Sequence, residues 1–258
     1  MTITLSPAAA RSLWLLEWRR LVRTPRALAL AAVYVAFGLI EPLVTRYQNQ
    51  LLRTVSHGVR IQLPPPAAPQ ALGAYTSQVA TIGLVVVVAI AASSLTFDTR
   101  HGLAVFLRSR ATVTQLVGPR FAASAAAAAL AYLLGTLAAW YETSLLIGPL
   151  PAGRVLAGMA CGVAYLAFAV ALTVLAASVA RATIGATGIA LAVLLLIPVA
   201  GAIRVIGRWL PSSLVGAPAG LTGGAHPLSY YAPALIVTVV ASGAIMAAGI
   251  LRLRNREI

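Results

Sequence analysis

Few side chains in this sequence could do acid–base or metal chemistry, and those few are widely separated. The 258 residues include five acidic residues and three histidines. His101 has no second ligand at the spacing of a metal site, and His57 and His226 are equally isolated. We therefore predict no metal site, and we expect His101 to be an exposed loop residue or a contact to a partner.

Nucleophilic chemistry has no assembled set of residues either. Ser93, Ser94, Ser124 and Ser178 fall within apolar stretches, where hydroxyls usually bond to backbone carbonyls or neighbouring helices. Cys161, the only cysteine, is expected to be a small buried core residue. The sequence contains no Gly-x-x-x-x-Gly-Lys-[Ser/Thr] motif and no lysine, so it has no phosphate-binding P-loop. We predict no catalytic residue and no cofactor in this chain.

Two acidic residues lie near the ends of apolar stretches, where charge is costly unless it meets protein or water. Glu41 is followed five residues later by Arg46. A helix-end ion pair between them is one interpretation, and a substrate or gating contact of Glu41 is the other. Tyr34 and Phe37 precede Glu41 and either line a pathway or simply pack. Glu142 is expected to be a solvated or paired end residue.

The composition indicates the elements that hold these residues. Of all residues 60% are hydrophobic and 9% charged, against about 25% charged in an average soluble domain. A soluble fold of this size cannot hide so much apolar surface. The net charge is +14, and every basic residue is arginine. The arginines stand in short clusters between apolar stretches, which is typical of membrane flanks and not of a nucleic-acid-binding face.

We therefore predict an all-α integral membrane protein with six spans. A span needs about 20 apolar residues to cross roughly 30 Å of hydrocarbon. The stretches that qualify lie at about 27–45, 75–97, 121–141, 155–180, 182–203 and 232–251. They form one domain, 26–258, after an N-terminal segment, 1–25. The apolar but Gly- and Pro-broken segment 204–231 is expected to form short re-entrant or interfacial pieces.

The distribution of arginines predicts that both termini are cytoplasmic, in a multi-pass protein of the bacterial cell membrane. With the N-terminus inside, few arginines lie outside: Arg46, Arg53, Arg60, Arg154, Arg204 and Arg208.

The N-terminal segment is predicted to be an amphipathic helix on the membrane surface. One face carries Trp14 and Trp18, and the opposite face carries Arg19, Arg20 and Arg23. The helix either anchors the chain only or also supports a cytoplasmic partner.

A second cytoplasmic helix is predicted at 98–110, between the second and third spans. Asp98 can cap it. An apolar ridge, which we call the loop ridge, follows at i, i+3 and i+4: Leu103, Phe106 and Leu107. Arg100 and Arg108 flank this ridge. Such a helix either seats in a groove of a partner protein or serves as a solvated or lipid-facing connector.

The layout resembles that of a type-2 ABC exporter permease, the half-size transmembrane subunit. The family's loop begins with an acid, continues through a glycine and apolar residues, and reaches a small-residue turn and a basic residue that opens the next span. The corresponding residues here are Asp98, Gly102, Leu103, Leu107, Thr112 and Gly118-Pro119-Arg120. Trp209-Leu210-Pro211-Ser212-Ser213-Leu214 resembles the family's Leu-Pro stretch before the last span. Arg100 stands where the family has a second acid, and Arg110 where a proline is common.

The resemblance implies that two permease chains, identical or different, form a translocation pathway. It also implies that each docks a separate ATPase, which holds ATP and Mg, through the loop helix (Asp98, Arg100, His101, Gly102, Leu103, Phe106, Leu107 and Arg108) and the surface helix. Tyr34, Phe37 and Glu41 would lie along the pathway. Two alternatives remain from the residues alone. One is a membrane-embedded enzyme, an intramembrane protease or lipid-modifying enzyme, and the other is an ion-coupled secondary transporter.

Overall fold

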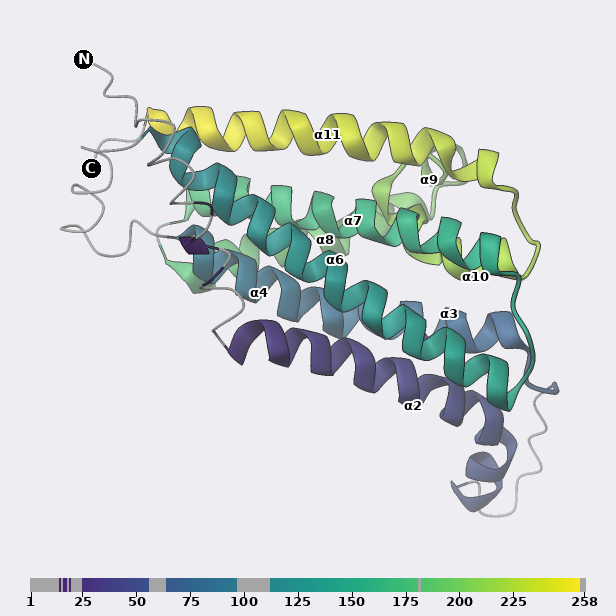
Figure 1. Ribbon diagram of the computed structural model, residues 1–258. Coiled ribbons are helices and arrows are strands. Elements are labelled where there is room, and N and C mark those ends of the chain that lie inside the picture. The colour runs from purple at the N-terminus through teal and green to yellow at the C-terminus, as the bar shows by residue number, and fades with distance from the viewer. Residues whose placement is uncertain are drawn as a thin grey trace.

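The chain forms a bundle of long helices that run side by side (Figure 1). The computed structural model describes residues 25–55, 64–96, 112–180 and 182–255, together with residues 14, 16, 17 and 19. No strand occurs within these ranges. Six helical stretches among the described residues are long and apolar enough to cross a membrane, which confirms the number of spans predicted.

The first three of these stretches are α2 (Pro25–Val55), the continuous run of α3 (Ala68–Gln78), the π-helix η1 (Val79–Gly83) and α4 (Leu84–Leu95), and then α6 (Val113–Leu146). The last three are α7 (Ala152–Val179), α8 (Thr183–Gly201) and α11 (Leu228–Arg254). Because the number of spans is even, α2 begins and α11 ends at the same end of the bundle (Figure 1). We call this end proximal and the opposite end distal.

Helix α7 is the centre of the bundle. In its most apolar stretch 67% of residues are buried, against 22% in α2 and 17% in both α8 and α11. The three outer helices instead present large apolar side chains, such as Ile184, which is 87% exposed, and Val199 and Val240. An apolar surface of this extent is expected where lipid, not water, surrounds a helix.

Most helices extend beyond the apolar stretches that predicted them. Helix α2 continues through Pro42 to Val55. Helix α6 begins at Val113, after a capping box in which Thr112 and Gln115 exchange side-chain and backbone hydrogen bonds. The expected turn at Gly118-Pro119 is therefore wrong, because those residues lie in the second turn of α6. Apolar runs mark the depth of hydrocarbon, whereas caps fix where a helix begins.

The segment before the last span forms short helices that do not cross the bundle. They are α9 (Arg204–Gly207), the 3-10 helix η3 (Pro211–Gly216) and α10 (Ala217–Thr222). Leu214, Ala217 and Leu221 are buried. Gly158 of α7 lies so close to Pro218 of α10 that a Cβ atom there would collide with it. Short pieces occur as predicted up to Thr222, whereas residues 228–231 already belong to the last long helix, and their re-entrant or interfacial position stays a prediction. η3 and α10 fold back against α7 at the distal end (Figure 1).

Candidate functional site

Charged side chains meet at the proximal end of the bundle. Arg120, at the end of the second turn of α6, donates from Nε to Oε1 of Glu17 over 3.0 Å. The two side chains are only 10% and 18% exposed. A pair so shielded is much less weakened by salt than one on a surface, and losing either partner leaves a poorly solvated charge. Glu17 is therefore tied to α6 across 103 positions of sequence.

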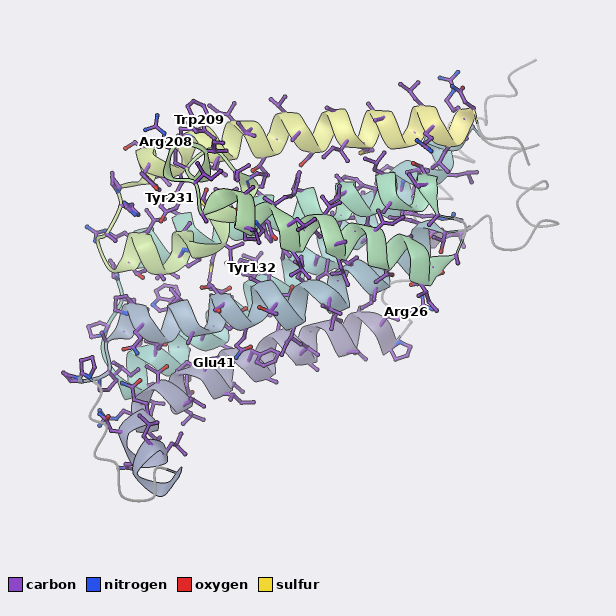
Figure 2. All side chains as sticks on the ribbon, turned by 180° about the vertical axis from the view of Figure 1, so that it is seen from behind. Arg26, Glu41, Tyr132, Arg208, Trp209 and Tyr231 are labelled. Atoms are coloured by element: carbon purple, nitrogen blue, oxygen red, sulfur yellow. The ribbon has the colours of Figure 1, made fainter. Side chains whose placement is uncertain are left out.

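A second arginine joins α2 to α4 at the same end. Nη1 of Arg26 donates to Oγ of Ser93 over 3.0 Å, and Ser93 donates in turn to the carbonyl of Ile90 over 2.7 Å. Figure 2 shows Arg26 at the proximal end, in the first turn of α2. Since α2 otherwise has few contacts with α4, this hydrogen bond spans a gap between the two helices.

These groups border one pocket between α2, α4 and α6. Its space is about 480 Å³, including open solvent at the mouth. The polar part of the lining consists of Glu17, Arg26, Ser94, Arg120 and Ser124. Ser94 and Ser124 lie 3.1 Å apart, oxygen to oxygen, so one donates to the other between α4 and α6. Two guanidinium groups, which bind anions readily, therefore border the same pocket.

The serines behave as the sequence predicted. Ser94 donates to the carbonyl of Ala91 and Ser178 to that of Leu175. The prediction for Cys161 is also confirmed, because its thiol is free and buried in α7. Among the described residues no group of three or more His, Cys, Asp or Glu side chains could hold a metal ion.

A cluster of tyrosines occupies the middle of the bundle. Tyr34 of α2 meets Tyr132 of α6 edge to face, and Tyr75 of α3 stacks on Tyr132, each with ring centres 6.4 Å apart. Gly135 makes room for them, since a Cβ there would collide with the Tyr34 backbone and the Tyr75 hydroxyl. Thr136 donates to the carbonyl of Tyr132 over 2.8 Å. Close helix crossings of this kind hold α2, α3 and α6 together.

The predicted pathway residues lie inside this single chain. Tyr34 is fully buried and Phe37 is partly buried against the core. Glu41 is 9% exposed and lies farther toward the distal end than Arg26 (Figure 2). Their place along a pathway between two permeases stays a prediction.

The ion pair between Glu41 and Arg46 does not form in the part of the chain that the structure describes. Five residues correspond to about 140° around a helix. Glu41 therefore points inward while the exposed Arg46 points away from the bundle.

The structure places only part of the predicted docking elements. Trp14 and Arg19 are helical and exposed. Trp18, Arg20 and Arg23 lie outside the described residues, as does the whole loop helix with its ridge. Sequence reasoning missed Glu17, although it is the single acid before Glu41 and stands among arginines. A single carboxylate among several arginines was the available sign that Glu17 forms an ion pair.

Comparison with known proteins adds no relative. No protein-family model matches the chain, and no curated protein matches it.

Proposed function

We propose that the chain is the transmembrane permease subunit of an ATP-driven exporter in the bacterial cell membrane. It pairs with a second permease chain, and two separate ATPase subunits, holding ATP and Mg, supply the energy. The proximal end is then the cytoplasmic end.

The architecture supports this proposal. The described residues form six apolar helices, of which α7 is the most buried, and the sequence lacks a P-loop, so energy from ATP would have to come from another chain. The arginine pattern of the whole sequence predicts an excess on the side of the two termini, as expected of a cytoplasmic face. Among the described residues the arginines divide evenly: Arg19, Arg26, Arg120, Arg252 and Arg254 lie at the proximal end, and Arg46, Arg53, Arg154, Arg204 and Arg208 lie at the distal end.

The observation that carries the proposal is the ion pair between Glu17 and Arg120. Residues 98–110, the proposed docking loop, come directly before α6, and Arg120 lies two turns into that helix. Glu17 belongs to the other proposed docking element. The loop is continuous in sequence with α6, and Glu17 is joined to α6 by the ion pair. A displacement of either docking element would therefore be transmitted to α6. A displacement of α6 would in turn move α2, because the two helices are closely packed where Gly38 lies against the backbone of Gly135 and Ala139.

The test is ATP hydrolysis by the assembly isolated through a tag on this chain. We expect a P-loop ATPase to purify with the wild-type chain and with Glu17→Gln. We expect the rate of ATP hydrolysis of the Glu17→Gln assembly to be the same in detergent and in lipid, because the ion pair that connects Glu17 to α6 is lost. The charge swap Glu17→Arg with Arg120→Glu should restore part of the difference between detergent and lipid. Arg154→Gln, a change at the distal end, is the matched control.

Each outcome decides between classes of function. A chain that purifies without an ATPase and hydrolyses no ATP contradicts the proposal. Transport by the chain alone, driven by an ion gradient, would favour the secondary transporter. Turnover of a lipid or peptide by the chain alone would favour the membrane-embedded enzyme.

A further inference from the structure

The proximal pocket has two chemically different parts. Among the described residues its polar rim carries two guanidinium groups and one carboxylate, so positive charge is in excess among these groups. Arg120 is held in place by Glu17, and its side chain is nine-tenths buried. Arg26 uses one of its five N–H donors on Ser93. An arginine fixed at one donor can present others as a planar fork, the geometry that binds phosphate.

The rest of the lining is mostly apolar. Leu30 of α2 is only 2% exposed and forms one wall. Ile90 of α4 and the small residues Ala123 and Ala127 of α6 complete the apolar part, and the paired hydroxyls of Ser94 and Ser124 lie among them. Small side chains on this wall leave more room beside α6 than larger ones would. A charged rim next to a mostly apolar lining matches a molecule with an anionic head and an acyl tail, and does not match a free inorganic anion, which has no use for the apolar part.

Helix α2 packs along α6 and α3 but has few contacts with α4, so an opening of the pocket is expected between α2 and α4. Ala27, one turn before Leu30, lines the pocket on the α2 side and would border that opening. Arg26 is in the first turn of an apolar helix, which is the level where headgroups lie when that helix spans a bilayer. A lipid of the surrounding leaflet can therefore enter sideways with its head at the rim.

We propose that this pocket binds an anionic phospholipid of the proximal leaflet, with the phosphate between Arg26 and Arg120 and one acyl chain along the Ala123–Ala127 wall. Basic pockets between spans are known to hold anionic headgroups. The bound lipid bridges α2, α4 and α6, next to the bond between Glu17 and Arg120. This inference needs the chain to span a bilayer but does not depend on an ATPase partner.

The experiment measures lipid binding to the purified full chain in detergent by native mass spectrometry. The probes are phosphatidylglycerol and phosphatidylcholine with identical acyl chains, and inorganic phosphate. We expect phosphatidylglycerol to bind about tenfold more tightly than phosphatidylcholine. Arg26→Ala should lower that affinity about tenfold, and Arg26→Lys less, because lysine keeps the charge but not the fork. Arg46→Ala is the control, since Arg46 is an exposed arginine at the other end of the same helix.

A second variant separates lipid from free anion. Ala27→Phe should obstruct the opening and weaken phosphatidylglycerol binding while the rim stays intact. The proposal is overturned if the two lipids bind equally, or if Arg26→Ala and Arg46→Ala behave alike. It is also overturned if inorganic phosphate displaces the lipid at comparable concentration and Ala27→Phe changes nothing, because the site would then hold only a free anion.

Discussion

Removing Glu17 should destabilise the chain more than removing Arg120, although both substitutions break the same ion pair. The Arg120 side chain is 10% exposed and cannot lose its charge, whereas the Glu17 side chain is 18% exposed and belongs to a segment at the end of the bundle. Glu17→Gln therefore leaves a buried guanidinium, and we expect a cost of about 2 to 4 kcal/mol, between the values for exposed and buried pairs. Arg120→Gln leaves a carboxylate that can turn outward and should cost less.

The assay is the free energy of unfolding in mixed micelles titrated with SDS, for wild type, each single variant and the double variant. The coupling energy from this cycle should be about 1 to 3 kcal/mol. It should change little between low salt and 0.5 M salt, because the pair is shielded. Single costs below about 0.5 kcal/mol that add without coupling would refute the claim that this bond holds the N-terminal segment to α6.

Three further predictions follow from the packing and the proposed docking. Gly135→Ala should destabilise the chain by about 1 to 3 kcal/mol in the same assay, because a Cβ there collides with the tyrosine cluster. Gly188→Ala is the control, because a Cβ at Gly188 meets open space and should not destabilise the chain. Equal effects of the two substitutions would contradict the close helix crossing at Gly135. Cys161, buried in α7, should react with a maleimide only after SDS is added, and rapid labelling of the native chain would contradict its burial. Aspartates at the three positions of the loop ridge should release the ATPase during purification while the chain still inserts, and an intact complex would show that the ridge does not dock it.

The spans were predictable because any helix that crosses a bilayer needs a long run of apolar residues. The stretches from Ala27 onward supply such runs without any knowledge of packing. The break between α6 and α7 at Gly148-Pro149-Leu150-Pro151 was predictable for the same local reason, since proline and glycine interrupt a helix. Local signals of this kind need no long-range information.

The site could not be predicted in the same way. The partners Glu17 and Arg120, and likewise Arg26 and Ser93, are brought together only by the way helices cross. Hydropathy says nothing about which helix lies beside which. The pair of Glu41 and Arg46 is a wrong interpretation of a different kind. The two residues are near in sequence, but five positions correspond to about 140° around a helix, so they point in different directions.

The proposed function is tested most directly by the mass of the intact assembly, measured by native mass spectrometry after gentle extraction through a tag on this chain. We expect two permease chains with two P-loop ATPase subunits, and release of the ATPases when the loop ridge is replaced. A mass equal to this chain alone, or to copies of it alone, under conditions that preserve its activity would show that the chain does not work with an ATPase.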